Sequence, residues 1–104
     1  MTGPMKILAK LKGDAASVRV VVNHPMESGL RKGVDGKTVP MHHIQHVTVA
    51  LNGKVVITGQ LGGSISKNPS LGFVIKGAKA RDKVSVTWVD SNGAKRTDEA
   101  VVVV

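Results

Sequence analysis

The sequence predicts an all-β protein, an immunoglobulin-like antiparallel β-sandwich of about seven strands. Valine occurs 18 times among 104 residues, and β-branched residues favour strands over helices. Short runs that alternate apolar and polar residues recur along the chain, and Gly, Asn or Asp turn signals separate them. No window of about eleven residues carries apolar side chains at helical spacing, so we expect no amphipathic helix.

The expected strands follow one another at short intervals. Gly13-Asp14 separates the first two strands, and Gly77 follows the fifth. Asn52-Gly53 lies between the third and fourth strands and supplies the positive φ angles of a type I′ hairpin turn. Ser91-Asn92-Gly93 indicates a second hairpin, between the last two strands. In chain order, the strands are expected at residues 5–11, 17–23, 44–51, 54–60, 71–76, 83–90 and 94–104.

Alternation within the strands predicts which side chains form the core. In the strand at 83–90, Val84, Val86 and Trp88 share one face. Trp88 is interpreted as a core residue, and its indole N–H then needs a hydrogen-bond partner. Similar apolar stripes consist of Leu71, Phe73 and Ile75, and of Val47, Val49 and Leu51.

Three segments are apolar on both faces: residues 20–22, 55–57 and 101–104. A strand of an antiparallel sandwich normally turns one polar face to water. We therefore expect that another protein covers part of the outer surface, because exposed apolar strands promote edge pairing and aggregation. The alternative is that valine only satisfies β-propensity on a tolerant surface.

Composition limits the classes of function. One domain over residues 1–104 is expected from the length. Fifteen Lys and Arg against seven Asp and Glu give a net charge of +8, which favours anionic partners. Phe73 and Trp88 are the only aromatic residues, and this argues against nucleic-acid binding by base stacking. No apolar run approaches the roughly 20 residues of a membrane-spanning helix, so no membrane contact is expected.

Catalytic and cofactor motifs are not found. The sequence has no cysteine, no HExxH, no phosphate-binding GxxxxGK[ST] and no GxSxG, so an enzyme and a bound cofactor are not expected. In an extended segment His42 and His46 lie about 13 Å apart, too far to share one metal ion, and His43 points to the opposite face. The histidines, His24 included, are interpreted as polar surface or interface residues.

The most distinctive segment is the long connection at residues 24–40. A loop this long in a small sandwich is often functional. Pro25 favours an extended conformation at the preceding histidine, and Gly29 permits a tight bend. Arg31 and Lys32 are expected to place positive charge near an exposed Met26.

This segment carries a family resemblance. Residues 24–44, HPMESGLRKGVDGKTVPMHHI, resemble the pattern HPMETGxRKDxxGKxIPRKII of the sulfur-oxidation carrier protein family SoxZ. The strand and Asn-Gly turn at 47–53, Phe73, the turn Ile65-Ser66-Lys67-Asn68-Pro69 and the segment at 88–93 match the same family. The resemblance spans roughly residues 5–104.

The resemblance implies a function as well as the immunoglobulin-like fold. It implies a non-catalytic subunit that forms a heterodimer with a SoxY-type subunit, whose C-terminal cysteine arm carries sulfur intermediates during thiosulfate oxidation. Other sulfur-oxidation enzymes would contact the complex transiently. No secretory signal is visible at the start of the sequence, and the resemblance implies a periplasmic protein exported together with its partner. Candidate contacts with the partner or with an anion are His24, Pro25, Met26, Gly29, Arg31, Lys32, Lys37, Asn68 and Pro69.

Two alternatives of other classes remain at this point. A basic β-domain associated with RNA or the ribosome would also carry a charge of +8, and it would bind nucleic acid at physiological salt. A sandwich that binds copper or zinc through its histidines would retain metal on purification.

Overall fold

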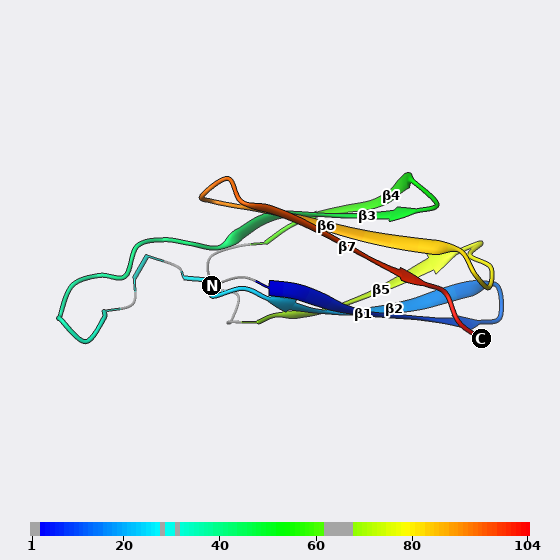
Figure 1. The fold of residues 1–104 in the computed structure, drawn as a ribbon, viewed down its shortest axis with the longest axis horizontal. Helices are drawn as coiled ribbons and strands as arrows, with labels where there is room; N and C mark the ends of the chain where they lie inside the picture. The colour runs from blue at the N-terminus through cyan, green and yellow to red at the C-terminus, as the bar shows by residue number, and fades with distance from the viewer. Residues whose placement is uncertain (1–2, 28, 31, 62–67) are drawn as a thin grey trace.

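The structure, a computed structural model, describes residues 3–27, 29–30, 32–61 and 68–104 and contains seven strands (Figure 1). No helix that could cross a membrane is present in these ranges. The strands are β1 (Gly3–Lys12), β2 (Ala15–Asn23), β3 (Ile44–Leu51), β4 (Lys54–Gln60), β5 (Ser70–Lys76), β6 (Lys83–Asp90) and β7 (Lys95–Val101).

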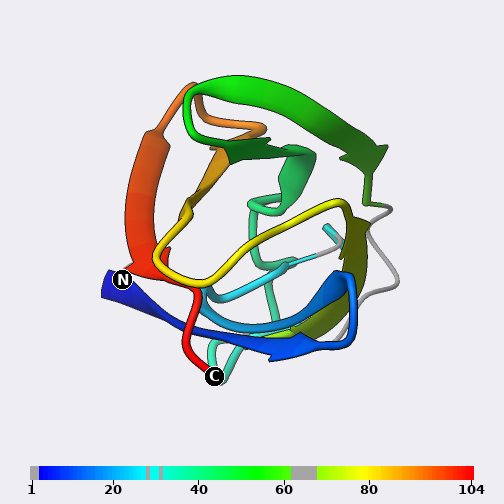
Figure 2. The same cartoon turned by 90° about the vertical axis from the view of Figure 1, so that its right-hand side faces the viewer.

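The strands form two antiparallel sheets that face each other. One sheet has the order β1-β2-β5 and the other the order β4-β3-β6-β7. In the view along the strands the sheets enclose a common interior (Figure 2). This arrangement is an immunoglobulin-like β-sandwich, which confirms the predicted fold class.

The core consists of the inward-facing side chains of both sheets. Val84, Val86 and Trp88 on β6 are fully buried, as their alternation predicts. Trp88 Nε1 has no hydrogen-bond partner among the described residues, although burial normally requires one. Other buried core residues are Met5, Ala9, Ala16, Val18, Val20, Val22, Ile44, Val47, Val49, Ile75, Ala78 and Val102.

The predicted strand bounds agree closely with the structure, except at the last strand. Positive φ angles at Asn52 (52°) and Gly53 (87°) confirm the type I′ turn between β3 and β4. The expectation that the last strand continues to residue 104 was wrong, because β7 ends at Val101. There the chain leaves β6: Val103 N donates a hydrogen bond to Ala9 O on β1 at 3.0 Å. The end of the chain therefore joins the two sheets on one side.

The valines that the sequence places on outer faces are exposed. Val21 is 42% exposed, Val56 41% and Val101 50%. Their neighbours Val20, Val22 and Val102 are buried, so two of the runs contribute to the core as well as to the surface. In the third run Val55 is exposed as well, and Ile57 is partly buried.

Candidate functional site

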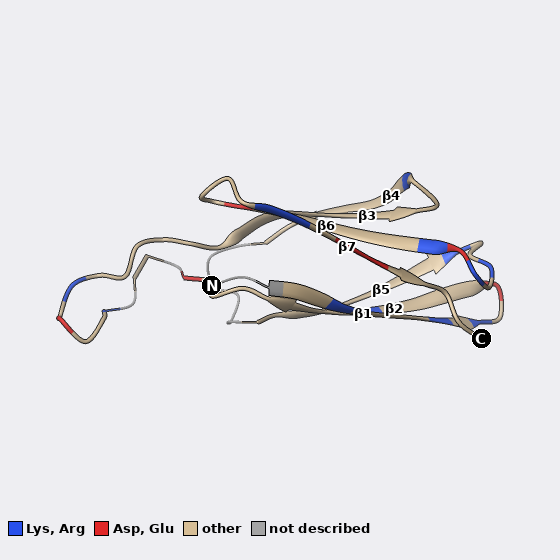
Figure 3. Ribbon diagram, viewed as in Figure 1, with Lys and Arg blue, Asp and Glu red and all other residues tan. Residues whose placement is uncertain are grey.

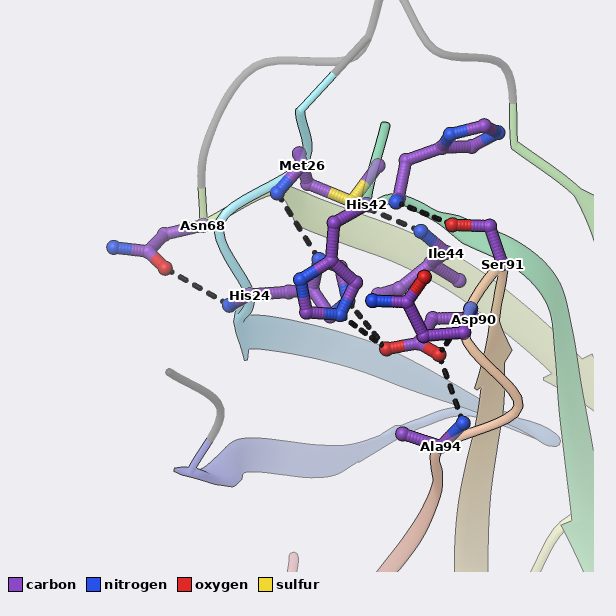
Figure 4. Close-up of polar contacts among 10 residues, drawn as sticks. His24, Met26, His42, Ile44, Asn68, Asp90, Ser91 and Ala94 are labelled. Carbon is purple, nitrogen blue, oxygen red and sulfur yellow. Dashed lines mark hydrogen bonds and ion pairs between the residues drawn. The ribbon is translucent and has the colours of Figure 1, made fainter. Parts of the chain in front are cut away.

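A buried carboxylate lies at the end of β6, where the sandwich meets the long connection. Asp90 continues the inward-facing stripe of Val84, Val86 and Trp88, and it is fully buried. Its Oδ2 accepts hydrogen bonds from His24 Nε2 at 3.0 Å and from His42 Nε2 at 2.7 Å (Figure 4). Through this one oxygen, Asp90 links His24, which follows β2, to His42, which lies just before β3.

The second oxygen of Asp90 organises the turn between β6 and β7. Its Oδ1 accepts hydrogen bonds from the backbone N–H groups of Asn92 at 3.0 Å and Ala94 at 2.9 Å. Burial alone would raise the pKa of Asp90. The hydrogen bonds from His24, His42 and the two amides outweigh burial, and the pKa is lowered below its usual value. Asp90 is therefore a carboxylate that accepts four hydrogen bonds, and we call it and the two histidines the clamp.

The hydrogen bonds of His24 fix its tautomer. The backbone N–H of Met26 donates to His24 Nδ1 at 3.0 Å, so Nδ1 carries the lone pair and Nε2 carries the proton donated to Asp90. Burial lowers the pKa of His24, and this outweighs the opposite effect of the hydrogen bond to Asp90. The ring packs edge-on against Trp88, with the centroids 5.1 Å apart, and against His42 at 4.6 Å. His24 is thus a neutral core residue.

The clamp holds the base of a protruding segment, which we call the finger (residues 25–41). Glu27 and His42 exchange two backbone hydrogen bonds across its base, at 2.6 and 2.9 Å. His24 N donates to Asn68 Oδ1 at 3.0 Å, and Asn68 N donates back to His24 O at 3.0 Å. Three segments that carry the family resemblance, at His24, Asn68 and Asp90, therefore meet at one place.

The finger extends beyond one end of the sandwich and makes the molecule 52 Å long and 20 Å wide (Figure 1). Near its end Gly33 N donates to Lys37 O at 2.8 Å, and Lys37 N donates to Asp35 Oδ1 at 3.0 Å. Figure 3 shows both basic and acidic residues at this distal turn. Leu30 and Val34 expose almost all of their side chains. The finger thus presents apolar groups and charged groups of both signs away from the sandwich.

The structure divides the predicted contact residues into two groups. Lys32, Lys37 and Asn68 are exposed, and Pro25 and Gly29 are partly exposed. Gly29 has φ 89°, and a Cβ there would lie 3.3 Å from Met41 Cβ, so the bend requires glycine. These residues are available to a partner at the finger or its base.

The other predicted contact residues are not at the surface. Two expectations were wrong: His24 is not a surface histidine, and Met26 is not exposed. Met26 is buried because its backbone N–H binds His24 and its sulfur accepts a hydrogen bond from Ile44 N at 3.3 Å. Pro69 is also buried, and its carbonyl accepts from Val22 N. Arg31 and the predicted turn residues Ile65, Ser66 and Lys67 lie outside the described residues.

The clamp has the composition of a metal site but not the required proton arrangement. The ligand atoms of His24, His42 and Asp90 lie within 4.8 Å of one another. A metal on His24 Nε2 would require the proton on Nδ1, and Nδ1–H would then point at the N–H of Met26. Metal-bound histidines normally donate the other ring N–H to an acceptor. The contacts of His24 therefore fit a structural clamp and not a metal centre.

Sequence reasoning compared His42 with His46 and missed the clamp. His24 and Asp90 are 66 positions apart, so local spacing does not reveal their contact. A signal was present, because Asp90 continues the inward-facing stripe of β6. A carboxylate at a core position needs hydrogen-bond donors, and the end of β6 adjoins the two segments that carry histidines.

The comparisons with known proteins address the fold and the family separately. A solved structure of a superoxide reductase (neelaredoxin) variant from Ignicoccus hospitalis is similar with a TM-score of 0.67 and 17% identity, over 97% of this chain and 79% of that chain. At this identity the similarity shows the fold alone. No curated protein sequence matches the chain. The model of the family described as "Sulphur oxidation protein SoxZ" matches residues 5–101, and the chain therefore belongs to the SoxZ family.

Proposed function

We propose that this chain is the non-catalytic subunit of a SoxYZ sulfur carrier complex, in which it binds and supports a SoxY-type subunit. The C-terminal cysteine arm of that partner carries the covalent sulfur intermediates of thiosulfate oxidation. The observation that carries the proposal is the match to the SoxZ family over residues 5–101, which includes almost the whole sandwich, the clamp and the finger. Membership of this family makes the chain a sulfur-oxidation protein.

The chain's own residues support a binding role. The sequence contains no cysteine, so no thiol of this chain can hold a sulfur intermediate. Within the clamp, His24 offers no free base, because it uses Nδ1 for the N–H of Met26 and Nε2 for Asp90. Its contribution is to hold the finger in a defined position at one end of the sandwich. A positioned, partly apolar finger suits a subunit that presents its complex to several enzymes in turn.

The positive charge of the chain supports a second contribution to the proposed function, the attraction of anionic sulfur adducts. Thiosulfonate adducts are anionic, and a chain with a net charge of +8 attracts anions at low salt. Lys32 and Lys37 are exposed on the finger, where they are available to a charged arm or substrate. We also propose that the complex works in the periplasm, where this chain arrives together with its partner; this rests on the family resemblance.

The proposal is tested by co-purification. A tagged version of this chain is expressed together with a subunit that ends in a Gly-Gly-Cys-Gly-Gly arm. We expect both chains to elute together at physiological salt, in equal amounts. If the tagged chain elutes alone while the second subunit is present and folded in the same lysate, the proposed function is wrong.

Neutralising the exposed lysines of the finger should slow thiosulfate oxidation by the assembled sulfur-oxidation proteins. For the double variant Lys32→Gln and Lys37→Gln we expect thiosulfate-dependent turnover to fall several-fold at low ionic strength and much less at high salt, because salt screens exposed charges. Lys12→Gln with Lys79→Gln removes the same charge from exposed sites near the opposite end of the sandwich and is the matched control. Equal turnover of both variants at every salt concentration would contradict a role of the finger charges.

A further inference from the structure

The two long sides of the sandwich are closed to different degrees. On one side, Leu11 N of β1 donates to Val103 O at 2.7 Å, and Met5 N of β1 donates to the Asp98 carboxylate of β7 at 3.0 Å. On the other side, β4 and β5 are the edge strands of their sheets, and no hydrogen bond between described residues joins them. Figure 2 shows β4 and β5 at the borders of their sheets. We call this side the open side.

The edge strand β4 has few of the features that protect natural sheet edges. Such edges normally carry charged residues or proline, which prevent pairing with another chain. After Lys54, β4 reads Val-Val-Ile-Thr-Gly-Gln, without charge or proline. Val55 is 54% exposed and Val56 41%. One register shift occurs opposite Val49 and Ala50, but the run from Ile57 to Gln60 pairs regularly with β3. This run is suited to accept another strand.

Both edge strands also contain a glycine that the described chain does not require. Gly59 on β4 and Gly72 on β5 do not have positive φ angles. A Cβ added to either would meet no atom of the described chain within 4 Å. Glycine within a strand costs roughly 0.5–1 kcal/mol relative to alanine, and it often marks a place where another backbone approaches closely. The two glycines therefore indicate a neighbour outside this chain.

Between the two edges, the core is incompletely covered. Ile57 on β4 and Leu71 and Phe73 on β5 contact the core but are only partly buried. Their counterparts on inner strands, such as Val49 and Val86, are fully buried. A strand added along β4 would remove this partly exposed apolar surface from water, and each Å² buried contributes roughly 25 cal/mol.

Charge argues that the added strand does not come from a second copy. Two copies would each bring a net charge of +8, and repulsion between them opposes association. We propose that the SoxY-type carrier subunit covers the open side by adding a strand to the edge of β4. This inference rests on the proposed function and specifies the face of the chain that it uses. Strand addition provides main-chain hydrogen bonds for affinity and side-chain pockets for specificity.

Charged residues introduced on the open side test this inference. In the double variant Val55→Lys and Val56→Lys, two lysines hinder the pairing of the β4 edge with a strand of another chain. The control is Val101→Lys with Val103→Lys, which adds the same charge at valines that are 50% and 49% exposed on the closed side. Affinity for the carrier subunit is measured by calorimetry at physiological salt. We expect at least a tenfold loss for the β4 variant and less than a threefold change for the control.

Gly59→Val provides a variant that should remain folded. Valine favours strands, and a Cβ added at Gly59 lies in open space within the described chain, so thermal stability of the isolated chain should be retained or increased. The added side chain should still weaken the carrier subunit's binding at least tenfold.

The outcomes separate this inference from the proposed function. Failure of the unaltered chain to bind the carrier subunit would overturn both. Unaltered affinity in both β4 variants, while the unaltered chain binds, would overturn only the assignment of the open side. Self-association of the isolated chain that is lost in the Val55→Lys and Val56→Lys variant would assign β4 to a second copy and would also contradict the inference.

Discussion

Replacing Asp90 by alanine is expected to lower the free energy of unfolding by about 3 kcal/mol or more. The substitution leaves the buried donor of His24 without an acceptor, which costs about 1–3 kcal/mol. It also removes the hydrogen bonds to the amides of Asn92 and Ala94, about 1 kcal/mol each. In a domain of about 100 residues, a loss of this size lowers Tm by about 12 °C or more.

Urea titration of the isolated variant at pH 7 measures this effect. Asp14→Ala, at an exposed carboxylate in the turn between β1 and β2, is the matched control and should change stability by about 0.5 kcal/mol or less. We also expect the finger of the Asp90 variant to become more sensitive to proteolysis, because the clamp no longer joins its two ends. Equal stability of the two variants would show that the clamp does not hold the fold together.

Stability is also expected to fall with acidification. Burial lowers the pKa of His24 below its usual value of 6.5, so between these two pKa values the unfolded chain binds a proton that the folded chain does not. The stability from neutral His24 is present above about pH 6.5 and is lost as the pH falls. The hydrogen bonds that overcome burial also lower the pKa of Asp90 below 3.8, so a second loss follows in stronger acid.

A variant without the buried imidazole separates the loss of stability caused by His24 from the loss caused by Asp90. In His24→Gln, the side chain retains a donor and an acceptor but does not titrate. Its stability at pH 7 should be lower than that of the unaltered chain, and its decline between pH 7 and pH 5 should be shallower. Urea midpoints at half-unit pH intervals provide the comparison. Parallel curves for the two proteins would contradict the assignment of this loss to His24.

Most of the fold was predictable because its strands follow local rules. Residues 44–51, 54–60 and 83–90 were predicted with the bounds that β3, β4 and β6 have. In β3 and β6, alternation and a following turn define the ends, whereas the start of β4 is defined by the Asn52-Gly53 turn before it. The last strand was predicted too long, because valine alone does not show that the chain turns from β6 toward β1 at Val102.

The clamp was not predictable from local spacing, although each of its members was visible. Alternation shows which face of a strand a residue occupies, but it does not show which distant segment lies opposite that face. The sequence led to the interpretation of His24 as a surface or interface residue, because histidine is polar and is often exposed. Its burial depends on Asp90 and Met26, which are brought to it by the pairing of separate strands. The charges of the finger were visible in the sequence, whereas its fixed base was not.

Sedimentation velocity of this chain mixed with a SoxY-type subunit decides whether the proposed heterodimer forms. With both proteins at micromolar concentration and physiological salt, we expect a single species with the mass of one copy of each chain. Two separate boundaries, with each protein sedimenting as it does alone, would contradict the claim that this chain is the supporting subunit of a sulfur carrier complex.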